Sequence, residues 1–249
     1  MRSLTDSCMR DPIHPIRIFL TILFFTSPWA ALPQSQKYWP KRPFPYLLAE
    51  NKLWIGTPSG LYQFHFDEDS WSIFGEHNGL ADDHVRAVHW DGQWIWALTD
   101  SGLSYGDVRL NKWVTFDGSS GLPGGRIHSI AFQEDYAWIG TDRGAARFDK
   151  LIQEWDRFGL SEGLPDTVVF DVATDGPVVY FATARGLAEY HVQFEKWRYY
   201  GKTEGIACDT IRFILQTTED LWLFTSDGPL RFNKKMHSTL SFAGDPRMR

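Results

Sequence analysis

The sequence is poor in the residues that build covalent frameworks and metal sites. It has two cysteines in 249 residues, Cys8 and Cys208, and no Cys-x-x-Cys pair. A disulfide framework is therefore excluded, and so is a site built from cysteine pairs. A Gly-rich phosphate loop, a Gly-x-Ser-x-Gly elbow and a His-Glu-x-x-His helix are also missing. We accordingly predict no cofactor, no metal and no catalytic residue.

Positive charge is also scarce. The chain has 25 Lys and Arg against 31 Asp and Glu, a formal net charge of -6. No stripe of basic residues stands out, so nucleic acid is not an expected partner.

The apolar run near the N-terminus, IFLTILFF at 18–25, is too short to cross a bilayer comfortably. Arg2, Arg10 and Arg17 precede it, and small residues at Ala30 and Ala31 follow it. This pattern favours an export signal over residues 1–31 rather than a membrane anchor, so contact with a membrane is expected only if this leader stays uncleaved. The polar, proline-rich residues 32–42 are predicted to be a linker.

Aromatic residues and an internal repeat are what the sequence has in abundance. Aromatics make up 16% of the chain, with 12 Trp, and the stretch WIGTDRGAARFD at 138–149 recurs four more times in related form. The copies follow one another at a step of 42 residues, kept by Trp54, Trp96, Trp138 and Trp222, by Thr57, Thr99, Thr141, Thr183 and Thr225, and by Gly60, Gly102, Gly144, Gly186 and Gly228. A second series keeps the same step: Trp71, Trp113, Trp155 and Trp197. A fixed period near 42 in strand-rich units predicts the blades of a β-propeller.

Each repeat has room for four strands and little else. In the second unit, apolar runs at 85–89, 94–99, 103–108 and 112–116 are separated by turn residues such as Asp91-Gly92. Helical periodicity is absent, so we predict an all-β chain with almost no helix. The blades should begin near residues 43, 85, 127, 169 and 211, and the propeller should cover 43–242, followed by a tail at 243–249.

These boundaries give five whole four-stranded blades and no blade shared between the two ends of the chain. The ring must then close by packing the first blade on the fifth, or stay open. The fifth unit departs from the others, because Thr239 stands in the Trp register and Pro229 opens its third strand. Terminal repeats of an array commonly show such departures.

The segments 121–149 and 163–190 resemble the two-component regulator propeller repeat. They share its Gly-Leu-Pro opening, apolar strand, acidic turn and Trp-Ile-Gly-Thr-type strand, and the resemblance covers roughly residues 43–242. Such repeats occur in periplasmic sensor regions of bacterial hybrid signalling proteins. The resemblance therefore implies a periplasmic or secreted propeller that senses a ligand or binds a protein.

The sequence also departs from that family. Five blades are fewer than its rings usually have, no transmembrane, kinase or DNA-binding segment follows the repeats, and Leu98 and Phe224 replace a repeat glycine. A free-standing binding module that works through a partner, such as a membrane-bound signalling protein, fits these departures. The ligand itself, a small molecule or a protein, is not specified by the sequence.

Residues that repeat are expected to be structural. The Thr and Gly series should build hairpin turns in which Gly takes positive φ, and the Trp series should pack between blades. Asp82-Asp83-His84 favours a loop-initiating turn over a metal site, because three consecutive residues rarely converge on one ion.

Residues that do not repeat are the candidates for function, because a blade does not need them. The inner strands carry Arg86, His128, Asp171 and Arg212, and the loops at the same face carry Arg126, Arg143 and Arg185. Together the arginines could bind a carboxylate or a phosphate. The competing interpretation is a solvated rim with cross-blade ion pairs.

Two other functions remain open at this point. A propeller enzyme of the glycoside hydrolase or lyase type would need two carboxylates about 5–10 Å apart, and only Asp171 is a strong inner-strand candidate. The chain could also be a non-autonomous fragment of a larger propeller. Both are weaker expectations than a binding module.

Overall fold

The structure, a computed structural model, describes residues 44–107, 112–206 and 210–242. The expected leader, linker and tail, together with Cys8 and Cys208, lie outside the described residues.

The described chain forms twenty strands, four from each repeat. Their bounds in chain order are β1 (Tyr46–Ala49), β2 (Lys52–Thr57), β3 (Gly60–His65), β4 (Ser70–Phe74), β5 (Val85–Trp90), β6 (Trp94–Thr99), β7 (Leu103–Asp107), β8 (Lys112–Phe116), β9 (Ile127–Gln133), β10 (Tyr136–Thr141), β11 (Gly144–Asp149), β12 (Glu154–Phe158), β13 (Val169–Asp175), β14 (Val178–Thr183), β15 (Gly186–His191), β16 (Lys196–Tyr200), β17 (Ile211–Gln216), β18 (Asp220–Thr225), β19 (Gly228–Asn233) and β20 (Ser238–Ser241).

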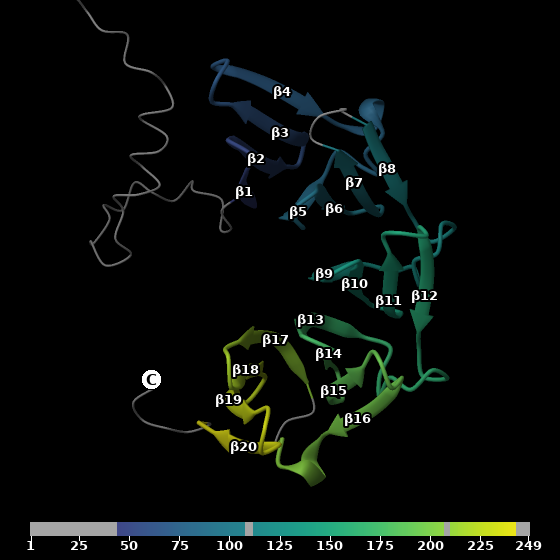
Figure 1. The fold of residues 1–249 in the computed structure, drawn as a ribbon, viewed down its shortest axis with the longest axis vertical. Helices are drawn as coiled ribbons and strands as arrows, with labels where there is room; N and C mark the ends of the chain where they lie inside the picture. The colour runs from purple at the N-terminus through teal and green to yellow at the C-terminus, as the bar shows by residue number, and fades with distance from the viewer. Residues whose placement is uncertain (1–43, 108–111, 207–209, 243–249) are drawn as a thin grey trace, which may run out of the picture. The chain divides into compact units, whose positions relative to one another are not determined.

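Each group of four consecutive strands makes one antiparallel sheet, in sequence order from its first to its fourth strand. Figure 1 shows the first strands β1, β5, β9, β13 and β17 on the inner side and the fourth strands on the outer side. The predicted fold class is confirmed: the described chain is all-β, with five four-stranded blades and no strand shared between the ends.

The core lies between sheets rather than within one. Four buried hydrophobic clusters are found among the described residues, and each joins two consecutive sheets. Trp96 of the second sheet packs on Phe148 of the third, and Trp138 of the third packs on Tyr190 of the fourth. Within the described residues, no such cluster joins the fifth sheet to the first, so the five blades do not close into a ring.

The repeated threonine builds the hairpin turn between the second and third strand of each sheet. In the third sheet, the Thr141 hydroxyl donates to the Gly144 carbonyl at 2.9 Å and accepts from the Arg143 amide at 3.0 Å. The other four threonines donate to their glycine carbonyls in the same way. One side chain thus satisfies two turn groups in the third blade and at least one in every other, which explains why the residue recurs.

Two properties could explain why the glycine recurs: a positive φ, and a backbone atom too close to leave room for a Cβ. Only the second is found at both Gly144 and Gly102. Gly144 has φ 126°, and a Cβ there would lie 2.4 Å from the Phe158 carbonyl oxygen. Gly102 does not have a positive φ, so our expectation is wrong at that position. A Cβ at Gly102 would still lie 2.3 Å from the Phe116 carbonyl oxygen. Close approach of the fourth strand therefore requires glycine even where the backbone conformation does not.

Helix is almost absent, as expected from the missing helical periodicity. The helical segments found in the described residues are two three-residue 3-10 turns, η1 (Glu76–Asn78) and η2 (Lys202–Glu204). No helix among the described residues has the length and apolar character to cross a membrane.

Candidate functional site

In four of the five sheets, a β-bulge near the start of the first strand leaves one extra residue, whose side chain the bulge redirects. In the second sheet Val85 pairs with Thr99 and Ala87 with Leu98, so Arg86 is the extra residue. The same shift occurs in the next three sheets and makes His128, Phe170 and Arg212 the extra residues. Bulges re-aim side chains and are enriched beside functional sites. The repeat therefore provides one equivalent, variable position at the inner edge of each of these sheets.

These bulge residues connect consecutive sheets. An Arg86 guanidinium nitrogen donates to the Ile127 carbonyl of the third sheet at 3.0 Å. The His128 ring lies 5.6 Å from the Phe170 ring, and Arg212 Cζ lies 5.1 Å from the centroid of that same ring. Arg86, His128 and Arg212 were selected from the sequence, whereas Phe170 was missed. Its place in the same 42-residue series was the available signal.

Arg86 acts mainly as a tether between sheets. It forms an ion pair with Asp100 at 2.6 Å and donates to the Thr99 carbonyl at 2.5 Å. Burial, and then the neighbouring charge of Arg126, lowers the pKa of Arg86, while Asp100 opposes that shift. With its donors directed at protein atoms, Arg86 has less capacity for a ligand than its charge indicated.

Asp142 organises the loop face of the third sheet. Its Oδ1 lies 2.5 Å from His128 Nε2, and its Oδ2 accepts from the Arg126 amide at 3.1 Å. Burial of Asp142 opposes ionisation, but the bonds from His128 and the Arg126 amide, with the charges of both residues, hold its pKa below the ordinary value. Asp142 is therefore more than a turn residue, because it fixes His128 and the start of β9.

Arg143 lies beside a repeat position that holds an aspartate in the second and fourth blades and a glycine in its own blade. Positions 82, 124 and 166 are equivalent in the repeat, as are positions 101, 143 and 185. Asp82 accepts from Ser101 at 2.5 Å, and Asp166 lies 3.3 Å from Arg185.

Gly124 replaces that aspartate in the third sheet, and a Cβ built on it would lie 3.9 Å from both Cδ and Nη1 of Arg143. The Arg143 side chain thus runs alongside the turn at Gly124, where there is no side chain. In the described part of the chain, no carboxylate is paired with its guanidinium.

The glycine turn remains satisfied without the missing aspartate. In the second and fourth sheets the aspartate also accepts from the amide two residues on, that of His84 or Val168, each at 2.8 Å. In the third sheet Asp142 supplies the acceptor for the equivalent amide, that of Arg126. The substitution therefore removes a charge beside Arg143 while the backbone keeps its partner.

Asp171 faces the fifth sheet rather than open solvent. Its Oδ1 accepts from the Val172 amide at 2.9 Å, and its Oδ2 accepts from the Ile214 amide of β17 at 2.8 Å. Burial raises the pKa of this carboxyl to about 6, against the opposing effect of the two amides. The carboxylate is thus a tether between the fourth and fifth sheets. Within the described residues, no group of three or more His, Cys, Asp and Glu side chains converges as metal ligands.

Apart from Arg86 and Asp171, which tether neighbouring sheets, the candidate residues fall into two groups. Arg126, His128 and Arg143 belong to one blade, around the Gly124–Gly125 turn, where both glycines have positive φ. Arg185 and Arg212 belong to the next two blades, and each is already engaged, with Asp166 or with the Phe170 ring.

No family model matches the chain, and no curated protein matches it. Solved structures do match. The extracellular domain assigned to the hybrid two-component system BT3049 of B. thetaiotaomicron superposes with a TM-score of 0.64 at 17% identity, covering 79% of this chain and 29% of that one.

The extracellular domain assigned to the one-component system BT4673 of the same organism gives a TM-score of 0.64 at 17% identity, over 80% and 27% of the two chains. The WD40 repeats of RRP9 give a TM-score of 0.58 at 11% identity, over 80% and 63%.

This chain spans less than a third of the length of the two bacterial domains it matches. At these identities the likeness concerns the fold. The chain is similar to these extracellular domains and to WD40 repeats in the way its sheets are built and ordered, and its described residues have the fold of a β-propeller with five blades.

Proposed function

We propose that this chain is an extracytoplasmic ligand-binding propeller, and that its ligand carries a carboxylate or another small anionic group held by Arg143 and Arg126. The likeness to extracellular domains of signalling systems supports the location, periplasmic or secreted, and a sensing role. The anionic group follows from the site. Readout by a membrane-bound signalling partner is part of the same proposal.

The observation that carries the proposal is the Gly124 substitution. A guanidinium gains most from a bidentate partner, and the equivalent Arg185 already has one carboxylate beside it. Arg143 lacks that partner, and Arg126 adds a second positive charge close enough to lower the pKa of Asp142. A ligand anion beside Gly124 would take the role that the repeat's own carboxylate has in the neighbouring blades.

Binding rather than catalysis is the role that the carboxylates support. Both oxygens of Asp171 accept amide hydrogen bonds, and both oxygens of Asp142 are engaged by His128 and Arg126. A general acid or base needs a free oxygen directed at substrate. Each of these four oxygens already has a hydrogen-bond partner in the protein, whereas Arg143 has no carboxylate paired with it in the described part of the chain.

The test uses matched acids and neutral analogues: glucuronate and glucose, succinate and succinamide, adenosine monophosphate and adenosine. At a hundred times its Kd, a ligand adds about 2.7 kcal/mol to the free energy of unfolding. For a chain of this size this should raise Tm by about 5–10 °C. We expect at least one acid to produce this shift and its neutral analogue to produce none.

Three variants give the control. Gly124→Asp returns the repeat's carboxylate and should abolish the shift without removing any arginine, because Arg143 is then neutralised. Arg143→Gln should abolish it too. Arg185→Gln should leave it nearly unchanged, since Arg185 is paired with Asp166. An acid whose binding survives both Gly124→Asp and Arg143→Gln, or a panel in which no acid binds, would contradict the proposal.

A further inference from the structure

The first sheet has one face that, apart from Thr57 and Gly60 at the hairpin turn, carries only apolar or aromatic residues. The pairing of β1 to β4 places on this face Tyr46, Leu48, Leu53, Ile55, Tyr62, Phe64, Trp71 and Ile73. We call it the leading face, because it points away from the second sheet. Leu48 is 62% exposed and Trp71 is 51% exposed. An apolar patch of this extent is rare on a free monomer surface and marks an interaction site.

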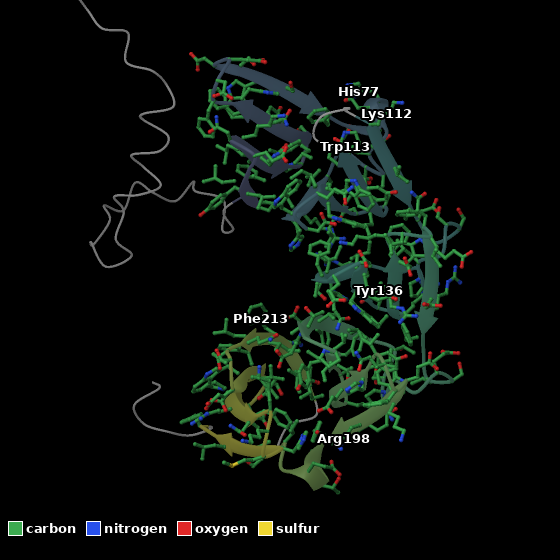
Figure 2. All side chains as sticks on the ribbon, in the orientation of Figure 1. His77, Lys112, Trp113, Tyr136, Arg198 and Phe213 are labelled. Atoms are coloured by element: carbon green, nitrogen blue, oxygen red, sulfur yellow. The ribbon has the colours of Figure 1, made fainter. Side chains whose placement is uncertain are left out.

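The fifth sheet has an apolar face at the opposite end of the array. The pairing of β17 to β20 places on it Phe213, Leu215, Trp222, Phe224 and Leu240, and Phe242 follows β20. We call it the trailing face; Figure 2 labels Phe213 on it. Phe213 is 51% exposed. Arg231 and Asp220, the charged residues that the pairing places on this face, form an ion pair at 2.7 Å.

The contacts inside the array show what these two faces are built to meet. At the first interface, Trp113 of β8, labelled in Figure 2, lies 6.4 Å from Trp54 and 5.5 Å from Phe74 between ring centroids. At the third interface, Trp197 of β16 contacts Phe158 of the preceding sheet at 5.9 Å. A Trp on a leading face thus packs on an aromatic pair of the trailing face before it.

Both halves of such an interface are present, unpartnered, on the described chain. Trp71 occupies the register of Trp113 and faces away from the array. On the trailing face, Trp222 and Phe242 stack at 5.4 Å and 24°. The equivalent pairs stack at 5.9 Å and 26° (Trp54 with Phe74) and at 5.6 Å and 29° (Trp138 with Phe158). The fifth sheet therefore presents the same aromatic pair that receives a Trp inside the array.

We propose that the trailing face of one copy of this chain binds the leading face of a second copy, with Trp71 of one seated on Trp222 and Phe242 of the other. This contact continues the stacking that joins the internal sheets. The repeat itself therefore indicates that the partner of each face is a second copy of this chain. It is a heterologous contact, since two different faces meet. The proposal is independent of the anion site.

One residue fits the repeat less well. Phe224 stands in the register of Gly56 and Gly140, where an added Cβ would come within 2.8 and 2.9 Å of the next sheet's valine. The same register holds Leu98, which is 2% exposed at the second interface, so a leucine is accommodated there. Phe224→Leu should therefore preserve or tighten the contact between copies.

Sedimentation of the full chain over a range of concentrations tests the proposal. We expect the wild-type chain to self-associate reversibly. Trp71→Glu, which blocks the leading face, and Phe242→Glu, which blocks the trailing face, should each sediment as monomers. An equal mixture of the two variants should form a one-to-one dimer, because one intact pair of faces remains. Trp71→Ala should weaken self-association at least about thirtyfold, as for truncation of a central interface tryptophan.

Leu151→Glu is the matched control, since Leu151 is 73% exposed and lies in a turn outside both faces, and it should associate as wild type does. Circular dichroism and Tm of every variant verify that it folds. The proposal is overturned if the wild-type chain stays monomeric, as it would if residues 1–43 or another protein covered a face. It is equally overturned if Trp71→Glu still self-associates, or if the mixture of blocked variants stays monomeric.

Discussion

Replacing Asp171 with asparagine should change the pH dependence of stability in a direction that the structure fixes. Burial raises the pKa of Asp171 to about 6, from an ordinary value of 3.8, although two amides donate to its carboxylate. Each pKa unit corresponds to about 1.4 kcal/mol, so ionised Asp171 costs the folded state roughly 3 kcal/mol relative to its protonated form.

The sign follows from where the proton is held. Between pH 3.8 and about 6 the folded chain keeps a proton on Asp171 that the unfolded chain has already released. The contribution of the protonated carboxyl is therefore fully present below pH 3.8 and is lost as the pH rises through about 6. An asparagine side chain cannot ionise, so the free energy of unfolding of the Asp171→Asn variant lacks this decrease with pH. Any other difference in stability between the variant and wild type does not depend on pH.

Urea unfolding followed by tryptophan fluorescence measures this difference at a series of pH values. Between about pH 4 and pH 7.5, the free energy of unfolding of wild type should fall relative to the variant by about 3 kcal/mol. Asp142→Asn provides the opposite case. Its pKa is lowered despite burial, so wild type should gain on this variant as the pH rises to about 3.8 and should show no further gain above it. A flat difference for Asp171→Asn, or a wild-type gain with pH, would show that the Val172 and Ile214 amides outweigh burial and would refute the reasoning.

Three further predictions concern the repeat itself, all measured as changes in the free energy of unfolding. Thr141→Val should cost about 1–3 kcal/mol, because the hydroxyl serves two turn groups, and Thr141→Ser should recover most of it. Gly144→Ala should cost clearly more than Gly92→Ala, because both have positive φ but only Gly144 would press its Cβ against a carbonyl; equal costs would argue against the close approach. Trp138→Ala should cost about 3–5 kcal/mol, since this side chain is fully buried between two sheets, and a loss below about 1 kcal/mol would mean that the interface is not packed as described.

Much of the fold follows from the sequence because the repeat is free of insertions. A 42-residue step fixes the first strand of every unit, and the first strands of the last four sheets begin at Val85, Ile127, Val169 and Ile211. In WIWALT, at 94–99, the side chains that point to either face of the strand are apolar, which predicts a sheet covered on both sides. Trp96, Ala97 and Leu98 are all buried. Period and alternation are local properties of the chain, so they can be identified without knowing any contact between distant residues.

The candidate site could be predicted only in part, because its properties depend on contacts between equivalent positions. The sequence marks Arg86 and Arg143 equally, as arginines that the repeat does not require. Only the structure shows that Arg86 is held by Asp100 and by two carbonyls, while no carboxylate forms an ion pair with Arg143 in the described part of the chain. Asp171 is a second example, because its partner is an amide 43 residues away in another sheet. Phe170 was missed because a bulge decides which residue points to the inner edge, although the 42-residue step from Arg86 and His128 marked its position.

The loop face can vary from blade to blade because the fold does not depend on it. The turn is completed by the threonine hydroxyl and by a glycine, and these recur in all five sheets. Asp82 and Asp166 each accept a hydrogen bond from the backbone amide two residues on. At the equivalent Gly124 there is no carboxylate, and Asp142 accepts from that amide instead. A glycine in place of the aspartate in the third blade therefore costs the backbone little, and it leaves the Arg143 guanidinium without a paired carboxylate in the described part of the chain. Because a second carboxylate can accept the same backbone amide, a loop carboxylate can be absent from one blade without loss of a backbone hydrogen bond. The third blade lacks the aspartate at position 124, so a ligand should be sought there.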